Sequence, residues 1–323
     1  MTDVVPLPPL VELLASARVV ALPLATRFRG VDVREAVLFE GPEGWTEFSP
    51  FAEYADAEAA TWLAAAIDFG WHPQPAPLRS EIPVNATIPA VAAASVPEIL
   101  ARFDGCRTAK VKVADLRQAP EPGFSSLADD VARVRAVREA MGPEGRIRVD
   151  ANGAWNLDEA EHAIHALAEF DLEYVEQPCA TIDELVELRR RRSAHPCTSR
   201  AGAADLLVIK AQPLGGVRRA LEIVAEAGLP AVVSSALDTS VGLAMGVALA
   251  AALPELEYDC GLGTSALFTT DVATPPLAPV AGVLQVGRIT PDEALLAGNE
   301  ASADRREWWL DRLARCYALL GAQ

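Results

Sequence analysis

Apolar and polar residues alternate over the first part of the chain, and this pattern predicts short strands. The strands are expected over residues 19–24, 31–39 and 45–48, with the turn Gly41-Pro42-Glu43-Gly44 before the last of them. Short alternating runs separated by such a turn are typical of a small antiparallel sheet. Apolar residues at helical spacing then predict a helix over residues 56–68. Together these elements predict an α+β domain over residues 1–81.

From residue 82 onwards, predicted strands alternate with predicted helices. Strands are expected over residues 82–88, 107–113, 146–151, 172–177, 205–211, 231–236 and 257–262. Helices are expected over residues 97–103, 127–141, 156–170, 216–227 and 240–252, and another begins at the Thr181/Glu184 capping box. This alternation predicts a parallel sheet that closes into a TIM-like barrel over residues 82–289. An amphipathic helix over residues 304–320 predicts that the segment 290–323 packs back on the first domain.

Composition narrows the class of partner. The 323 residues carry a net charge of −17 and have a pI near 4.7. Because nucleic acids and anionic membranes attract basic surfaces, this balance excludes both as main partners and favours a small-molecule substrate. The five cysteines are widely spaced without a Cys-x-x-Cys pair, which predicts reduced thiols and a cytoplasmic location. The sequence also predicts neither an export signal nor a membrane span.

Two lysines within one predicted strand are the first candidates for chemistry. Lys110 and Lys112 share one face of the strand, while Val111 and Val113 share the other. If the valines pack under helices, the lysines point into the space that the strand lines. The alternative is an edge strand in which lysine prevents aggregation.

Further polar residues stand where the other predicted strands end. They are Asp150 and Asn152, Glu176 and Gln177, Lys210, and Ser234 with Ser235. Active sites of parallel barrels form at this end of the strands, although a single acidic residue there is also a common helix cap. Converging carboxylates are the hard oxygen ligands that Mg²⁺ favours, and the flanking lysines could act as acid or base. Such a site suits proton removal next to a carboxylate, because a divalent ion offsets the charge of the enediolate.

With these residues in place, the chain resembles the enolase superfamily, and within it the actinobacterial o-succinylbenzoate synthase family. The resemblance rests on stretches along nearly the whole chain: residues 27–30, 44–50, 108–114, 148–155, 173–180, 210–216, 234–242 and 260–264. The lysine pair and Glu176-Gln177-Pro178-Cys179 are the most specific of them. The resemblance implies an α+β capping domain on a modified (β/α)₇β barrel.

The resemblance also implies an activity and a set of residue roles. The reaction is the Mg²⁺-dependent syn-dehydration of 2-succinyl-6-hydroxy-2,4-cyclohexadiene-1-carboxylate to o-succinylbenzoate in menaquinone biosynthesis. By matching position, Lys112 would be the base, Lys110 its electrostatic companion and Lys210 the cation across the ring. The remaining roles are Mg²⁺ binding by Asp150 and Glu176, substrate contact by Arg148, Asn152, Ser234 and Gly261, and closure over the site by a loop with Arg27 and Arg29.

One expected feature of this family is missing. Its members carry a third metal carboxylate at the end of the fifth barrel strand, but residues 191–200 lack both a carboxylate and a strand pattern. Asp205 precedes Lys210 by five residues, so it would lie roughly 16 Å down its strand, at the barrel floor. His195 and Cys197 are not expected to bind a metal. A natural deletion, an artificial one, or loss of a stretch from the recorded sequence would each explain the gap, and a true deletion predicts weak metal binding and poor stability.

Two further functions remain open from the sequence. Lys112 and Lys210 could serve as the two bases of an N-acylamino acid racemase, or support a cycloisomerase reaction, since one fold hosts several such activities. The missing carboxylate also leaves open a non-catalytic relative.

Overall fold

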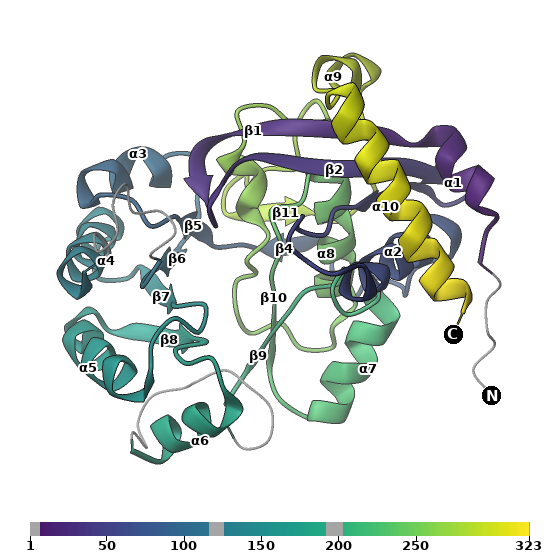
Figure 1. Ribbon diagram of the computed structural model, residues 1–323. Helices are drawn as coiled ribbons and strands as arrows, with labels where there is room; N and C mark the ends of the chain where they lie inside the picture. Colours follow the sequence, from purple (N-terminus) through teal and green to yellow (C-terminus); the bar gives the residue numbers. More distant parts are fainter. Residues whose placement is uncertain (1–6, 116–125, 192–202, 323) are drawn as a thin grey trace.

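The computed structural model describes residues 7–115, 126–191 and 203–322 of the chain. In Figure 1, a small α+β layer lies beside a barrel of strands and helices. Four cysteines in the described residues are free thiols: Cys106, Cys179, Cys260 and Cys316. Within the described residues, none of the helices combines the length and the apolar character that crossing a bilayer requires.

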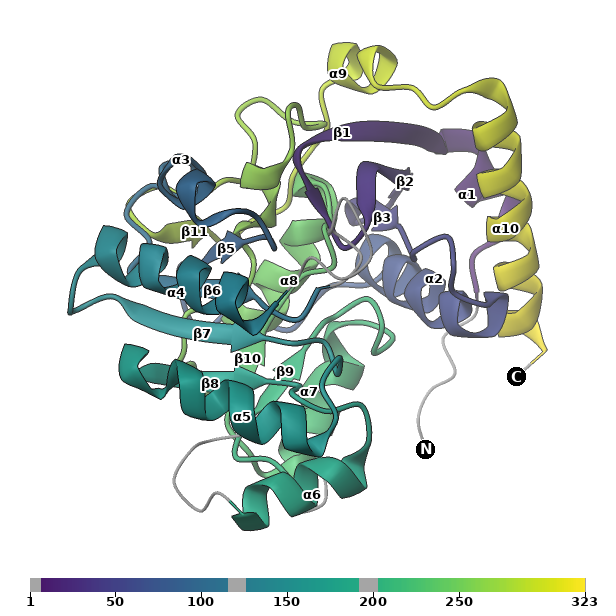
Figure 2. The ribbon, with the colours of Figure 1, turned by 60° about the vertical axis from the view of Figure 1, so that its left-hand side comes forward.

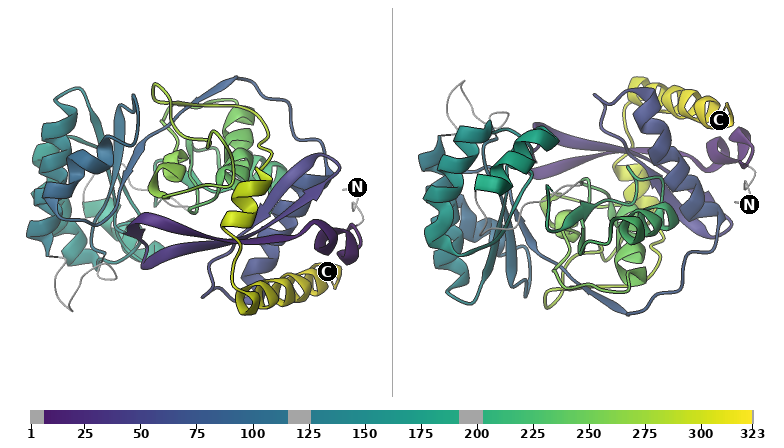
Figure 3. Two further views of the ribbon diagram at one scale, coloured as in Figure 1. Left: turned by 90° about the horizontal axis from the view of Figure 1, so that it is seen from above. Right: turned by 90° about the horizontal axis from the view of Figure 1, so that it is seen from below.

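The predicted antiparallel sheet near the start of the chain is confirmed. It contains β1 (Arg18–Phe28), β2 (Val31–Gly41) and β3 (Gly44–Phe48), in the order β1-β2-β3. The helix α2 (Asp56–Trp71) covers this sheet, and α1 (Leu10–Ser16) precedes it. In Figure 3, the tip of the long β1–β2 hairpin reaches from this capping layer across to the barrel strands.

The C-terminal helix α10 (Ala303–Gly321) packs on the capping layer, as its amphipathic pattern predicted. Trp309 and Leu313 share one apolar cluster with Trp62 and Leu63 of α2. The helix therefore joins the layer built by the first residues of the chain, although about 230 residues separate them. The exact domain boundaries at residues 81/82 and 289/290 stay a prediction.

The barrel strands form two parallel ladders. One has the order β5-β6-β7-β8 and the other pairs β9 with β10. These strands are β5 (Ala86–Ile88), β6 (Thr108–Lys112), β7 (Arg146–Asp150), β8 (Leu172–Glu176), β9 (Leu207–Ile209) and β10 (Ala231–Val233). Parallel bridges from Ser234 to Gly261 and from Cys260 to Val84 connect the two ladders on one side. Just before Val84 in the chain, β4 (Glu81–Pro83) pairs antiparallel with β11 (Val283–Gln285).

Helices cover the outside of these strands. They are α3 (Val96–Leu100), α4 (Leu127–Met141), α5 (Leu157–Leu167), α6 (Ile182–Arg191), α7 (Val217–Ala227) and α8 (Ser240–Ala252). The short helix α9 (Glu293–Gly298) lies instead beside β1 of the capping layer. In Figure 2, α4 and α5 lie along the outer face of β6 to β8. Capping boxes at Ser126, Asn156 and Thr181 begin three of these helices, and the one at Thr181 and Glu184 was predicted from the sequence.

The structure corrects one predicted strand and leaves another question open. Residues 257–262 form only the two isolated bridges at Cys260 and Gly261 instead of a full strand. Between β8 and β9 the described residues contain the helix α6 and no strand. The predicted absence of the fifth strand, and the expectation for His195 and Cys197, concern residues 192–202, which lie outside the described residues.

Candidate active site

The strand register places three of the predicted site residues in one row. Lys112 of β6 is paired with Asp150 of β7, and Asp150 is paired with Glu176 of β8. The neighbouring valines Val111 and Val149 point the other way, into the apolar core. Because β6 is paired on both sides, it is not an edge strand, and the alternative of a protective lysine pair is wrong. The lysines face the barrel interior.

Both lysines contact the carboxylates of that row. Lys112 Nζ lies 2.5 Å from Asp150 Oδ2 and 2.7 Å from Asn152 Oδ1. Lys110 Nζ lies 3.2 Å from Asp150 Oδ2 and 3.1 Å from Glu176 Oε2. The backbone N–H of Asn152 donates to Asp150 Oδ1 at 3.0 Å and so orients that carboxylate. Two ammonium groups and two carboxylates thus form one buried network.

The contacts within this network shift the pKa values of its four members in different directions. Burial would raise the pKa of Asp150, but Lys112 and Lys110 outweigh it and hold that pKa below its usual range. Burial and the charge of Asp150 raise the pKa of Glu176. Burial lowers the pKa of Lys112, and the neighbouring Lys110 charge lowers it further. Lys110 is the opposite case, because Glu176 and Asp150 raise its pKa despite burial. Lys112 is therefore the lysine of this strand that can release its proton more readily.

A third lysine faces the same cavity from the other ladder. Lys210 follows the last residue of β9 and lines the cavity together with Lys110 and Lys112. Burial and the positive charges of the two other lysines lower its pKa to about 8. The structure therefore brings the three predicted lysines together. Asp205 precedes β9, at the opposite end from Lys210, and is bonded to Arg189, which agrees with its predicted place at the barrel floor.

The predicted small residues form the wall across from the lysines. Ser234 and Gly261, which follow β10 and the next chain segment, line the cavity side by side. A Cβ on residue 261 would lie 2.8 Å from Ser234 Oγ, so a larger residue here would displace the Ser234 hydroxyl.

The capping layer closes the cavity from above. Arg29 lies in the β1–β2 turn with a φ of 52° and is followed by Gly30 with a φ of 80°. Its guanidinium carbon lies 4.1 Å from the centre of the Phe51 ring, and its Nη2 donates to Tyr54 Oη at 2.6 Å. With Phe28 and Phe51 also in the lining, the enclosed volume is about 40 Å³. Substrate pockets are usually several hundred cubic ångströms. A hollow of about 630 Å³ adjoins this enclosed part and shares Asn152 and Lys210 with it. Arg27 forms an exposed ion pair with Asp32 at the same turn.

Arg148, which the resemblance placed at the substrate, is buried next to the lysine row. It is fully buried one row below Asp150, opposite Lys110, and is bonded to Glu173. Its Nη1 donates to Asp259 O at 2.6 Å, and its guanidinium lies over the Tyr174 ring. These partners hold Arg148 in the barrel interior beside Lys110, while its Nη2 has no hydrogen-bond partner among the described residues, so contact with the substrate stays a prediction.

Comparison with known proteins agrees with this geometry. The enolase C-terminal domain-like family matches residues 92–293, and the enolase N-terminal domain-like family matches residues 19–70. An o-succinylbenzoate synthase from Mycolicibacterium smegmatis is 52% identical, with 97% of this chain and 98% of that protein covered. An o-succinylbenzoate synthase from Mycobacterium tuberculosis is 53% identical, with 97% of each covered. The chain belongs to the o-succinylbenzoate synthase family of the enolase superfamily.

Solved structures of the superfamily share the fold. Muconate lactonizing enzyme from Pseudomonas fluorescens superposes with a TM-score of 0.72 at 18% identity, over 88% of this chain and 98% of that one. N-succinyl Arg/Lys racemase from Bacillus cereus superposes with a TM-score of 0.71 at 19% identity, over 88% and 97%. These likenesses establish the barrel with its capping domain.

This chain is shorter than its alignment with one of these relatives. The alignment with the M. smegmatis synthase extends over 327 positions, which is more than the 323 residues of this chain. That relative therefore has residues that this chain lacks. In the sequence, no Asp or Glu occurs between Glu187 and Asp205. In the described residues, no three His, Cys, Asp or Glu side chains are grouped to hold a metal ion.

Two carboxylates nevertheless fit a magnesium ion. Asp150 and Glu176 both lie within 3.3 Å of one positive group, Lys110 Nζ, so a single cation could reach both. Mg²⁺ often binds through one or two carboxylates, and water and substrate oxygens complete its shell. The donor set therefore suits Mg²⁺ with fewer protein ligands than the family pattern has.

Several cavity residues were missed by sequence reasoning. They are Phe28, Phe51, Thr87, Ala236 and Thr264. Thr87 could have been found, because it is paired with Lys110 in the β5–β6 register. Phe51 had no such signal, since it comes from the capping layer and its position depends on how the two domains meet.

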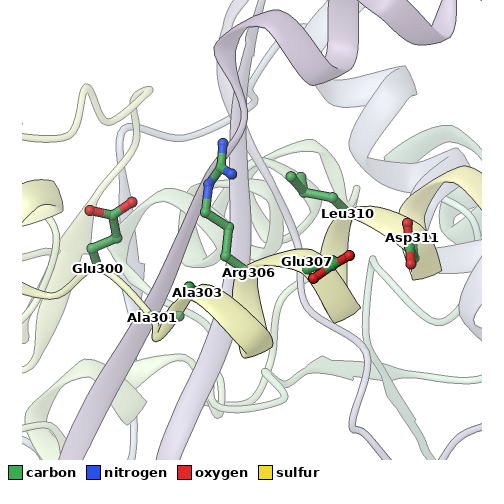
Figure 4. A pocket seen from close by; sticks show the side chains of 7 residues that line it. All are labelled: Glu300, Ala301, Ala303, Arg306, Glu307, Leu310 and Asp311. Carbon is green, nitrogen blue, oxygen red and sulfur yellow. The ribbon is translucent and has the colours of Figure 1, made fainter.

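A larger hollow elsewhere on the surface has no comparable chemistry. It runs along the first turns of α10 and has a volume of about 670 Å³ (Figure 4). Its charged side chains, among them Glu300, Arg306 and Asp311, are exposed. A solvated helix face explains these residues, so we assign no catalytic function to this hollow.

Proposed function

We propose that this protein is a Mg²⁺-dependent o-succinylbenzoate synthase that dehydrates 2-succinyl-6-hydroxy-2,4-cyclohexadiene-1-carboxylate in menaquinone biosynthesis. The observation that carries the proposal is an identity of 52% over nearly the full length of a synthase, together with an intact lysine row. A lyase of this type acts on a small carboxylate, and Lys110, Lys112 and Lys210 supply positive charge in the cavity of this otherwise acidic chain. A cytoplasmic location stays a prediction from the cysteine pattern.

In the proposed reaction, Lys112 is the base. As a neutral amine it takes the proton next to the substrate carboxylate, and the electron pair of the broken C–H bond moves into that carboxylate as an enediolate. The C–O bond to the hydroxyl then breaks, and the ring becomes aromatic. Because the elimination is syn, the Lys112 ammonium lies on the face from which hydroxide leaves and can return the proton to form water.

The surrounding groups stabilise the negative charge. Asp150 and Glu176 would hold Mg²⁺, which supplies positive charge to the substrate carboxylate when bound. Lys110 stays protonated and keeps the two carboxylates in place. Lys210, as a cation on the opposite side of the cavity, faces the ring and stabilises the developing charge. Asn152, Ser234, Gly261 and Arg29 would contact the substrate, with Arg29 carried by the turn that closes the cavity.

The test is turnover of the cyclohexadiene substrate by the purified protein with saturating Mg²⁺, followed as o-succinylbenzoate by mass spectrometry. Formation of the product at a rate that depends on protein concentration supports the proposal. No product from a protein with a folded circular-dichroism spectrum would instead favour a non-catalytic relative.

A racemase activity is a second candidate because Lys112 and Lys210 line the same cavity from different strands. Two bases on opposite sides of one carbon could remove and return its proton. Solvent deuterium entering the α-position of N-succinyl amino acids would support it, and its absence would leave the dehydratase alone.

A further inference from the structure

The chain segment after β10 forms one wall of the cavity in a strained conformation. Ser234, Ser235 and Ala236 line the cavity, and Leu237 follows with a φ of 63°. A bulky residue in this left-handed region is uncommon and persists only where its surroundings hold it. The contacts made by this segment therefore decide the shape of the wall.

Arg34 of the capping layer holds this segment through its backbone carbonyls. Its Nε donates to Leu237 O at 3.1 Å, and its Nη2 donates to Ala236 O at 3.4 Å. The same Nη2 donates to Ser49 O within the capping layer. The arginine comes from β2 and is only 3% exposed, so these bonds form away from water.

Glu47 of β3 holds the next residues along the chain. Its Oε2 accepts hydrogen bonds from Thr239 Oγ1 at 2.5 Å and from the Thr239 and Gly242 backbone N–H groups, both at 3.1 Å. It thereby satisfies N–H groups at the start of α8 from another domain. A Cβ on residue 242 would lie 2.6 Å from the carboxylate, so glycine at this position permits the contact.

Arg34 also contacts the opposite wall. Its guanidinium carbon lies 4.4 Å from the centre of the Phe51 ring, the same ring that Arg29 covers at 4.1 Å. Phe51 lines the cavity, whereas neither Arg34 nor Glu47 is part of the lining. One buried arginine thus connects the lid over the cavity to the wall formed by the barrel.

We propose that Arg34 and Glu47 act together as positioning residues, an interdomain clamp that fixes the Ser234–Leu237 wall for substrate binding. The proposal rests on the function proposed above only for its kinetic readout. Since the wall would contact the substrate in the ground state and in the transition state alike, loosening it should weaken binding in both.

The experiment compares the Arg34→Lys and Glu47→Gln variants with the unmodified protein. Lysine keeps the charge but loses the planar fork that reaches several carbonyls, and glutamine keeps the shape but loses the charge. Each variant is expected to raise KM by about tenfold with kcat changed by less than about threefold. A purely structural defect would lower the active fraction, which reduces the apparent kcat and leaves KM unchanged.

A matched control is Arg79→Lys. Arg79 donates to Ala250 O at 2.6 Å and to Leu253 O at 2.7 Å, so it holds the far end of the same helix α8 by the same kind of bond. It should leave KM unchanged. Amide hydrogen exchange over residues 234–243 gives a second readout that needs no substrate, and it should become faster in the two clamp variants only.

These readouts separate the clamp from the proposed function. If the unmodified protein does not turn over the substrate, the proposed function fails, and amide exchange alone decides on the clamp. An unchanged KM with unchanged exchange, or equal effects in Arg79→Lys, would overturn the clamp. If Arg34→Lys does not fold, the Glu47→Gln result decides by the same criteria.

Discussion

Lys112 Nζ lies 2.5 Å from Asp150 Oδ2, and this ion pair favours the charged form of the proposed base, against the burial that lowers its pKa. A base must first be neutral, so the contact opposes catalysis in the resting state. A divalent ion on Asp150 would weaken its attraction for the ammonium and favour the free amine. The same carboxylate therefore couples metal binding to the proton state of the lysine.

Replacing Lys112 by arginine is expected to abolish turnover. The guanidinium keeps the positive charge beside Asp150 but does not lose its proton in this pH range, so the loss should reach about 10²–10⁴-fold. Measurement of product formation tests this, and a circular-dichroism spectrum checks that the variant is folded. Residual activity within tenfold of the unmodified protein would mean that another group takes the proton.

Magnesium binding is expected to be weak, because Asp150 and Glu176 are the two carboxylates of the described residues that share one cation position. Calorimetric titration with Mg²⁺ should give a shallow binding isotherm. The Asp150→Asn and Glu176→Gln variants should show no binding of Mg²⁺. Mn²⁺ binding followed by electron paramagnetic resonance is a readout independent of activity.

Asp205→Asn is the matched control for that titration. Asp205 lies before β9 and is bonded to Arg189, so its loss should leave the isotherm unchanged. Tight binding near one equivalent in the unmodified protein would show that a further ligand completes the site.

The lysine row could be predicted from sequence because a strand has a period of two. That period places Lys110 and Lys112 on one face of their strand, and the polar residues at the ends of the other predicted strands indicate that this face is the inner one. The substrate contact expected of Arg148 came from the family resemblance, and the structure pairs this residue with Lys110, one row from Asp150. Strand periodicity alone does not tell how far its guanidinium reaches into the cavity.

Contacts between the domains could not be predicted. Arg34 and Leu237 are about 200 residues apart in the chain, and no local pattern connects them. The predicted strand at 257–262 failed for a related reason. Pairing extends only where Val84 and Ser234 flank Cys260 and Gly261, and this depends on the closed barrel and not on the propensity of the segment.

Activity is expected to fall at alkaline pH through Lys210. Its pKa of about 8 means that it is a cation below pH 8 and loses the charge above it. If that charge stabilises the transition state, kcat/KM should decrease as pH rises past 8, and a bound divalent ion would move the decrease to lower pH. The Lys210→Arg variant keeps the charge, so its kcat/KM should not show this decrease above pH 8. If the Lys210→Arg variant shows the same alkaline decrease in kcat/KM, a different group is responsible for it.

Stability is expected to fall between about pH 4.5 and 7 through Glu47. Burial and the charge of Asp238 raise its pKa to about 7 in the folded protein, against an ordinary value of 4.5. Between these values the folded state binds more protons than the unfolded state, so the free energy of unfolding decreases as pH rises. The contribution is on the order of 3 kcal/mol at most. Urea unfolding at pH 5 and pH 7.5 measures it. Glu47→Gln should reduce the difference between the two conditions, and an equal difference in both proteins would mean that Glu47 is already ionised at pH 5.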